Sequence, residues 1–266
     1  MPDFIKVSYP RERVVELSLS NPDKENRING EMVKELIDAL RELEDDGSTR
    51  VIVLTGEGDI FCGGADVDWI KDAQQHATLP HLDPGSRIVD ALHELDICPR
   101  PMIAKVNGNA FGAGAGMLAC SDIAIASESS QVAFQEINFG MVPGAGAIFA
   151  TKAIGLNQAN RWLLTGEEMS AAKAREIGLI HEVVADDQLD AEVNRQIDLL
   201  LQGGPRAQRE TKQLLRELSE RDKYQTPAYR TVFGHMFQRC LNSKEGKNGI
   251  DAILNNESPP WVPKKD

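Results

Sequence analysis

The sequence has few cysteines and lacks any cluster of histidines. Its four cysteines, Cys62, Cys98, Cys120 and Cys240, are widely spaced, and no two of them form a CxxC pair. This pattern disfavours a disulfide framework and a zinc site, and it is typical of reduced thiols in a cytosolic protein. We therefore expect no bound metal and a cytoplasmic location.

The sequence also lacks an excess of positive charge and any long hydrophobic run. Its 29 Lys and Arg residues face 41 Asp and Glu residues, which gives a formal net charge of −12. This balance disfavours nucleic-acid and anionic-membrane partners, although a phosphate-bearing ligand needs only a local cluster of donors. No apolar run approaches the length of a membrane span, and Met1-Pro2-Asp3 does not begin a basic and apolar leader. We expect neither a nucleic-acid nor a membrane partner.

Periodicity predicts an α/β chain with a helical end. Residues 14–19 alternate like a strand, residues 51–54 resemble a buried strand, and Asn29 can cap a helix that Gly47 ends. Strands with short helices dominate to about residue 200 and helices follow, among them 228–241 and 244–254. No linker rich in Gly and Ser separates the parts. We expect a core over 1–200 and a helical region over 201–266. Residues 76–86 have no clear period, and we predict that they form a surface segment or a lid near the site.

One stretch, Ile103 to Glu136, carries the strongest chemical signal. An apolar strand leads into a run of small residues around Gly112, Ala113 and Gly114, and the chain then restarts as a helix. Backbone N–H groups at a helix start lack partners, so they can receive a negative charge that is fixed or that develops in a reaction. Glu136 lies in an apolar and amide setting, where the pKa of a carboxyl group rises and the group can act as a base or acid.

Two other interpretations of this stretch are open. Gly112-x-Gly114 could belong to a dinucleotide fingerprint, with Glu136 near the expected ribose acid about twenty residues downstream. The third glycine position falls on Met117, however, and no long βαβ unit begins the chain. Alternatively, the small residues only allow a helix and a strand to pack closely.

Several motifs together resemble the crotonase (enoyl-CoA hydratase/isomerase) superfamily. These are Phe61-Cys-Gly-Gly-Ala-Asp-Val-Asp-Trp, Asn107-Gly with Gly112-Ala-Gly, Phe134-Gln-Glu-Ile-Asn-Phe-Gly, Leu164-Thr-Gly-Glu and Lys244-Glu-Gly. The resemblance covers essentially the whole chain. It implies an α/β fold, a spiral of ββα repeats with a helical C-terminal region that packs trimers and closes the site. It also implies a homotrimer or a dimer of trimers, and an acyl-CoA ligand whose coenzyme A is part of the substrate, with no separate cofactor.

The resemblance also implies a set of site residues. The backbone N–H groups of Gly63 and Ala113 match the family's oxyanion hole, and Glu136 matches one of its two glutamates. The segment Ala65-Asp66-Val67 matches the part that holds the adenine and pantetheine, and Lys24 matches a residue at the nucleotide end, with a solvated surface lysine as the alternative. The predicted substrate pocket comprises Trp69, Gly112, Gly116, Met117, Phe134 and Gly144.

The sequence departs from the two-glutamate hydratases at Gly116, where they carry their other glutamate. The family's C-terminal lysine falls near Asn256, which leaves Lys244 or Lys247 for that contact. One carboxylate suffices for hydration of a substituted enoyl-CoA (branched, carboxylated, cyclic or aromatic) in some branches, and this is the function we expect. Asp68, Gln135, Asn138 or a neighbour's Tyr229 could help to hold the water. The alternatives are a Δ3–Δ2 enoyl-CoA isomerase and a catalytically weak acyl-CoA-binding protein.

Overall fold

The structure of the chain, a computed structural model, describes residues 3–75, 83–218, 238 and 241–257. Most of the predicted segment 76–86, the predicted helix 228–241 and Tyr229 lie outside these residues. The predicted division into residues 1–200 and 201–266 stays a prediction.

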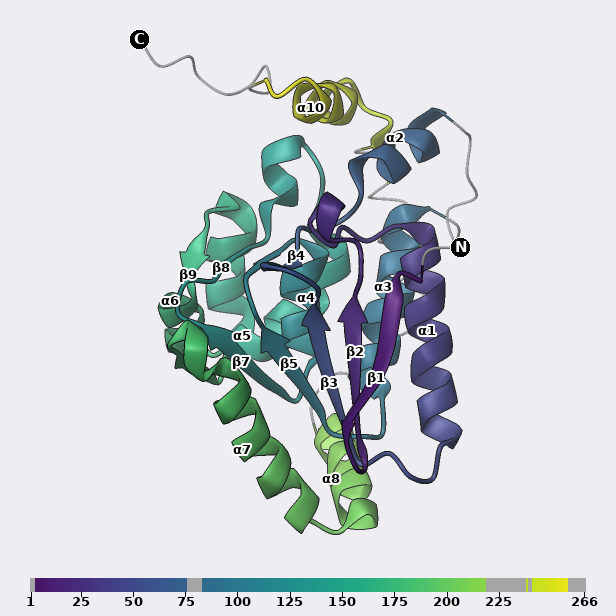
Figure 1. Cartoon of the computed structure of the whole chain (residues 1–266). Coiled ribbons are helices and arrows are strands. Elements are labelled where there is room, and N and C mark those ends of the chain that lie inside the picture. The colour runs from purple at the N-terminus through teal and green to yellow at the C-terminus, as the bar shows by residue number, and fades with distance from the viewer. Residues whose placement is uncertain (1–2, 76–82, 219–237, 239–240, 258–266) are drawn as a thin grey trace.

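A six-stranded sheet forms the centre of the molecule (Figure 1). Its strands follow the order β1-β2-β3-β5-β7-β10, and all neighbours are parallel except the antiparallel pair β1 and β2. The strands span Ile5–Arg11 (β1), Val14–Leu19 (β2), Val51–Gly56 (β3), Met102–Val106 (β5), Ile123–Ser127 (β7) and Glu182–Val184 (β10). In Figure 1 the arrowheads of β2 and β3 point toward the end of the molecule where α2 and α10 lie.

A second sheet of four short strands stands at that end. Its order is β4-β6-β8-β9, with β9 antiparallel to β8. The strands span Ile60–Cys62 (β4), Asn109–Phe111 (β6), Gln131–Ala133 (β8) and Met169–Ser170 (β9). Each of the turns β3–β4–α2, β5–β6–α4 and β7–β8–α5 therefore places one strand in each sheet before its helix. This confirms the expected α/β spiral.

The helices cover the sheets and end where local signals place them. They span Gly30–Asp45 (α1), Val67–Gln75 (α2), Pro84–Ile97 (α3), Ala113–Cys120 (α4), Gly144–Thr165 (α5), Ala171–Glu176 (α6), Leu189–Gln202 (α7), Pro205–Leu218 (α8) and Lys244–Leu254 (α10). Short 3₁₀ helices span Pro22–Lys24 (η1), Gln135–Phe139 (η2) and Asp186–Gln188 (η3). The predicted cap Asn29 accepts hydrogen bonds from two N–H groups of the first turn of α1, as expected.

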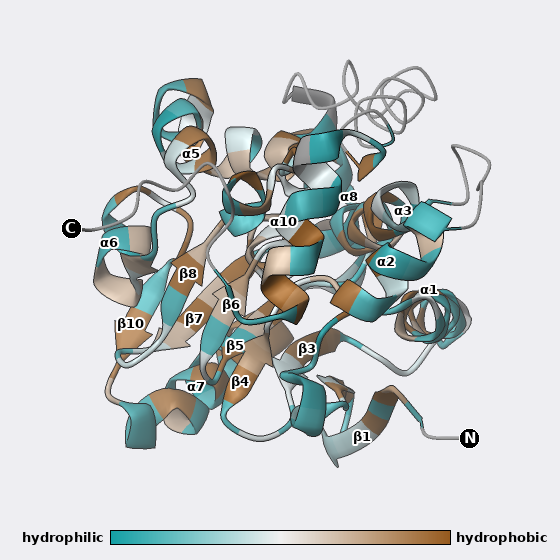
Figure 2. Ribbon diagram, turned by 90° about the horizontal axis from the view of Figure 1, so that it is seen from above, coloured by the Kyte–Doolittle hydropathy of each residue, from teal (hydrophilic) through white to brown (hydrophobic). Residues whose placement is uncertain are grey.

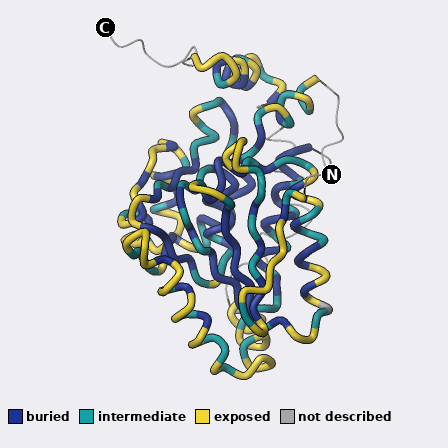
Figure 3. Tube along the Cα trace, in the orientation of Figure 1, coloured by how far each residue is buried: buried dark blue, intermediate teal, exposed yellow. Residues whose placement is uncertain are grey.

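The inner strands of the sheet are buried on both faces, which explains the continuous apolar run of β3, whereas the edge strand β1 is largely exposed. Ile52 and Leu54 face the main core under α1, α3, α4 and α5. Val51 and Val53 face the opposite side, where they pack with Leu189 and the rest of the apolar face of α7. Parallel strands covered on both sides lose the polar alternation of a half-exposed strand. Figure 3 shows burial in the inner strands and on the helix faces that pack against them, and Figure 2 shows hydrophobic residues along the strands of both sheets.

Two helices from distant parts of the chain meet above the strand ends. In Figures 1 and 2, α10 lies beside α2. The side-chain amide of Gln74 donates to the Leu241 carbonyl at 3.1 Å, and Lys71 pairs with Asp251 at 3.7 Å. The C-terminal helix is thereby fixed next to the site. Among the described helices, none combines the length and the hydropathy needed to span a membrane.

The structure corrects one prediction beside this region. Residues 83–86 are part of a capped helix and not of an irregular segment. The Asp83 carboxylate accepts hydrogen bonds from the backbone N–H of Ser86 at 3.0 Å and from its hydroxyl at 2.8 Å. This carboxylate therefore caps α3, whose first residues Pro84 and Gly85 reach the site.

Candidate active site

A cavity of about 290 Å³ opens between the second sheet, the starts of α3 and α4, η2 and α10. Its walls are apolar or glycine except for four polar side chains. It is lined by Glu25, Arg27, Gly63, Gly64, Ala65, Val67, Ile70, Pro84, Gly85, Ile88, Phe111, Gly112, Ala113, Gln135, Glu136, Phe139, Met141, Val142, Ala145 and Ile253. A small concave site with few polar groups is the usual form of a ligand site.

The turn at Gly112 presents the start of α4 to this cavity. Gly112 adopts φ 51°, a left-handed conformation that favours glycine, and its N–H donates to the Ala133 carbonyl at 2.8 Å. Ala113 is the first residue of α4 and lines the cavity, so its N–H has no acceptor within the helix. The predicted donor therefore belongs to the cavity wall, its N–H has no acceptor among the described residues, and the helix dipole favours negative charge there.

The second predicted donor, Gly63, is already occupied in this structure. Its N–H donates to the Glu25 carbonyl at 2.8 Å, so it is not available to a ligand. Ile28 forms a parallel bridge here, donating to the Gly64 carbonyl and accepting from the Asp66 N–H. The N–H of Ala65, between those two residues, therefore points away from Ile28, and among the described residues it has no acceptor.

This finding moves the second donor by two residues. Ala65 lines the same cavity as Ala113 and carries the free N–H that the sequence assigned to Gly63. The sequence could not show this, because the direction of each N–H depends on pairing with Ile28, more than thirty residues earlier.

Glu136 supplies an ionisable group, one oxygen of which is buried in the cavity wall. The residue as a whole is half-buried, but its Oε2 is buried and has no hydrogen-bond partner among the described residues. Burial raises the pKa of Glu136 from 4.5 to about 7, although a bond from its own backbone N–H opposes the shift. A Cβ on Gly112 would lie 3.2 Å from Glu136 Oε1, so the carboxyl group stands directly against the turn that begins α4.

Lys24 and Asp66 come together at the edge of this site. Lys24 Nζ lies 3.1 Å from Asp66 Oδ2 and 2.9 Å from Asp68 Oδ2, and these bonds, that to Asp68 first, raise the pKa of Lys24. Asp66 also caps α2 by accepting from the N–H groups of Asp68 and Trp69. Neither Lys24 nor Asp66 lines the cavity, whereas Ala65 and Val67 do. Their roles toward a nucleotide stay predictions.

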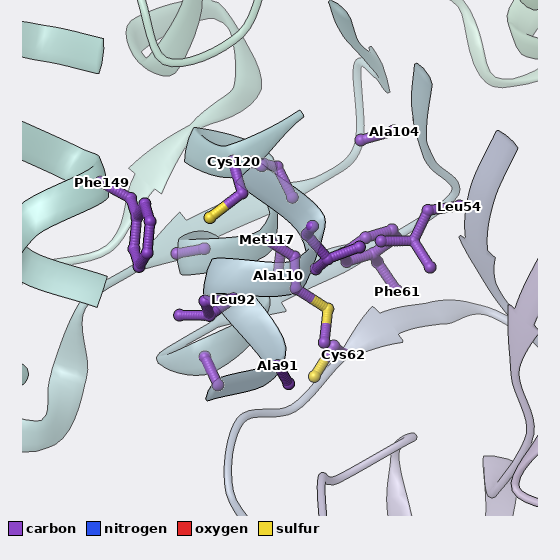
Figure 4. Packing of buried hydrophobic residues seen from close by; sticks show 14 of the residues in the cluster. Leu54, Phe61, Cys62, Ala91, Leu92, Ala104, Ala110, Met117, Cys120 and Phe149 are labelled. Carbon is purple, nitrogen blue, oxygen red and sulfur yellow. The ribbon is translucent and has the colours of Figure 1, made fainter. Parts of the chain in front are cut away.

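Several residues predicted for the pocket lie elsewhere. A Cβ on Gly116 would come within 2.9 Å of Leu92 Cδ1 and 3.4 Å of Gly146 Cα, so this part of α4 faces α3 and α5. Met117 and Phe134 are fully buried in the main core, and Figure 4 shows Met117 beside Ala110 and Leu92. Trp69 and Gly144 are also absent from the cavity wall. Of the predicted pocket set, Gly112 alone lines the cavity.

Other lining residues were missed. Glu25 and Arg27 lie in the loop between β2 and α1, and their sequence carries no helical or strand period that would have marked them. Ile253 reaches the cavity from α10, and only its apolar position on that helix hinted at burial. The described residues contain no group of three or more His, Cys, Asp or Glu that could hold a metal ion.

Comparison with known proteins gives one consistent result. The sequence model of the family described as enoyl-CoA hydratase/isomerase matches residues 10–264. The 2,3-dehydroadipyl-CoA hydratase of Escherichia coli K12 is 27% identical over 259 residues, covering 94% of this chain and 96% of that protein. The carnitinyl-CoA dehydratase of Proteus mirabilis is 30% identical over 256 residues, covering 94% and 95%. A crystal structure of an enoyl-CoA hydratase/isomerase from Pseudoalteromonas atlantica, 28% identical, superposes with a TM-score of 0.84 and covers 97% of this chain and 100% of that one.

Proposed function

Because the chain belongs to the enoyl-CoA hydratase/isomerase family, we propose that it is an acyl-CoA enzyme that hydrates a substituted enoyl-CoA through a thioester enolate. The observation that carries this proposal is the buried, unpartnered Glu136 oxygen in the same cavity as two free backbone N–H groups. The names of the related 2,3-dehydroadipyl-CoA hydratase and carnitinyl-CoA dehydratase support water addition or removal as the reaction class.

The two amides stabilise the charge that develops during the reaction. The thioester oxygen binds between the N–H groups of Ala65 and Ala113 and becomes an enolate oxygen when a nucleophile adds to the β-carbon. Fixed donors in a cavity shielded from water need no reorganisation at that moment, and each is worth about 3 kcal/mol of barrier.

Glu136 moves the proton. With a pKa of about 7, the carboxyl group exchanges protons easily near neutral pH. As a carboxylate it takes a proton from the attacking water, whose oxygen bonds to the β-carbon. The protonated group then gives that proton to the α-carbon, which converts the enolate back to a thioester and regenerates the Glu136 carboxylate.

Isomerisation of the double bond is the second candidate, and the surroundings of Gly116 favour it. Leu92 and Gly146 fill the space beside Gly116, so no carboxylate can occupy that place in the present packing. A single base that removes a proton at one carbon and returns it to another needs no held water. Gln135 is the remaining neutral polar side chain among the described lining residues, and the second carboxylate of the wall, Glu25, is paired with Arg27, so hydration would depend mainly on Glu136.

The proposal extends to features that the family resemblance alone supports. Coenzyme A enters as the handle of the thioester substrate and no separate cofactor takes part. The assembly is a homotrimer or a dimer of trimers, and the location is cytoplasmic.

Replacing Ala113 by proline tests the oxyanion site. Proline is compatible with the first position of a helix but has no N–H, so Ala113→Pro removes the donor while α4 can still form. We expect kcat/KM to fall about 100-fold, with unchanged circular dichroism. Loss of the conjugated enoyl absorbance measures hydration, and its appearance from a 3-enoyl-CoA measures isomerisation. Unchanged turnover in the folded variant would contradict the proposed site, and binding without either reaction in the unmodified protein would favour an acyl-CoA-binding protein.

A further inference from the structure

Arg27 is the sole cationic side chain among the described residues that line the cavity. The two acids in that wall are Glu25 and Glu136, and the other lining residues are apolar, glycine or Gln135. The charge of Arg27 reaches the interior, because it lowers the pKa of the buried Cys62 thiol, opposing the larger effect of burial. A guanidinium placed in an apolar wall requires a negative partner.

In this structure that partner is the chain's own Glu25. Arg27 Nη2 pairs with Glu25 Oε2, and the two side chains are 31% and 51% exposed. The Glu25 carboxylate lies over the cavity wall, since a Cβ on Gly63 would come within 3.0 Å of its Oε2. The Glu25 carboxylate is therefore already bound to the Arg27 guanidinium, and this pair lies beside the segment that carries the Ala65 N–H.

The backbone that holds this pair is fixed and strained. Glu25 and Asn26 both adopt the left-handed conformation, with φ 56° and 52°. Asn26 is fully buried, and its side-chain amide donates to the carbonyls of Glu57 at 2.9 Å and Ile60 at 2.7 Å. Strained backbone of this kind clusters at ligand sites. Here it directs two opposite charges into one cavity wall.

We propose that Arg27 is the anion-binding residue of this cavity and that an anionic group of the thioester ligand replaces Glu25 on its guanidinium. The group is a carboxylate on the acyl chain or a phosphate on the carrier, which share the planar or forked oxygen geometry that a guanidinium binds. The inference rests on the proposed function, because it concerns the ligand of the same cavity.

The exchange is favourable for two reasons. An ion pair as exposed as this one contributes little net stability, and Glu25, being the more exposed partner, can return to water. The nearby cation Lys24 is a poorer receptor, because Asp66 and Asp68 both already bind its ammonium group. Among the described contacts, the pair with Glu25 uses Nη2 alone of the guanidinium nitrogens.

Three thioesters test the proposal. Crotonyl-CoA is the reference, crotonyl-pantetheine has the same acyl group without phosphates, and glutaconyl-CoA adds a carboxylate to the acyl chain. Dissociation constants from calorimetry and kcat/KM are measured for the unmodified protein, Arg27→Gln, Arg27→Lys and Glu25→Gln. Arg13→Gln, which removes an exposed arginine paired with its neighbour Glu12, is the matched control.

We expect Arg27→Gln to weaken binding of one ligand by about 10- to 100-fold more than that of the ligand that lacks the same anionic group. A selective loss for glutaconyl-CoA over crotonyl-CoA identifies the acyl carboxylate, and a selective loss for crotonyl-CoA over crotonyl-pantetheine identifies the phosphate. Arg27→Lys should retain part of the affinity. Glu25→Gln should tighten binding of that same ligand, which removal of a merely structural ion pair would not do.

Equal weakening of all three ligands by Arg27→Gln, or none, overturns the proposal, and so does a Glu25→Gln variant that fails to tighten binding. The outcome is separable from that of the proposed function. Binding that depends on Arg27 but is not followed by turnover would support the anion site and refute the proposed enzymatic function. Turnover without selectivity for the anionic group would support the enzymatic function and refute the anion site.

Discussion

Replacing Glu136 by glutamine should make the protein inactive and, above neutral pH, more stable. Burial raises the pKa of this carboxyl group from 4.5 to about 7, so the folded protein holds the proton more tightly than the unfolded chain does. Glutamine has nearly the same shape, is uncharged at every pH and does not titrate. The variant therefore removes both the base and the cost of ionising it in a buried place.

The sign and size of the stability change follow from the pKa shift. Below pH 4.5 both states are protonated, and Glu136 costs nothing. Between pH 4.5 and 7 the unfolded chain loses its proton first, so the free energy of unfolding falls as pH rises. Above pH 7 the loss levels off at the full shift of 7 − 4.5 = 2.5 pH units, which corresponds to about 3 kcal/mol.

Urea unfolding near pH 4 and pH 8, at one protein concentration, measures this effect. We expect Glu136→Gln to match the unmodified protein near pH 4 and to exceed it by about 3 kcal/mol at pH 8. The exposed Glu128→Gln variant should show no such divergence. In the active protein, kcat/KM should rise about tenfold per pH unit up to pH 7 and then level off. A difference in the free energy of unfolding that does not change with pH would refute the ionisation assigned to Glu136. Full turnover by Glu136→Gln would refute its catalytic role.

Three further predictions concern the walls of the site. Gly112→Ala places a Cβ 3.2 Å from Glu136 Oε1 on a residue with positive φ, so kcat/KM should fall at least tenfold, and wild-type kinetics would contradict the placement of the carboxyl group. Asn26→Ala should lower the free energy of unfolding by about 3 kcal/mol, measured in urea, because three backbone groups lose their partner, whereas the exposed Asn242→Ala should have little effect. Cys62 is buried and burial raises its pKa to about 12, so its thiol should react with an aromatic disulfide reagent only after unfolding; rapid reaction in the native state would show that this part of the core opens.

The sequence predicts most of the fold because the relevant signals are local. The apolar run of β3 and the cap at Asn29 each depend on a few neighbouring residues, and the structure confirms them. The helix predicted over 244–254 has those same bounds. Strand β10 begins only at Glu182, because Gly178 turns the chain with φ 88° and the N–H groups of Leu179 and Ile180 still donate to the Ala174 carbonyl of α6.

The site was harder to predict because its geometry depends on distant partners. Glu136 and Ala113 stand out by chemistry, and the structure brings both to one cavity. The choice between Gly63 and Ala65 required knowledge of the bridge to Ile28. The family resemblance assigned Met117 to the pocket, but the structure buries its side chain in the main core.

The position of Ile253 has a consequence for how this enzyme comes into being. The enclosure is built from residues as far apart as 25 and 253, so a ribosome must release nearly the whole chain before the chamber can shut. A nascent or proteolytically cleaved molecule that ends before α10 would contain Glu136 and the N–H groups of Ala65 and Ala113, but water would still have free access to them. Catalysis would then require that synthesis of α10 is complete. A tag fused close behind Ile253 would interfere with the packing of this helix over the cavity.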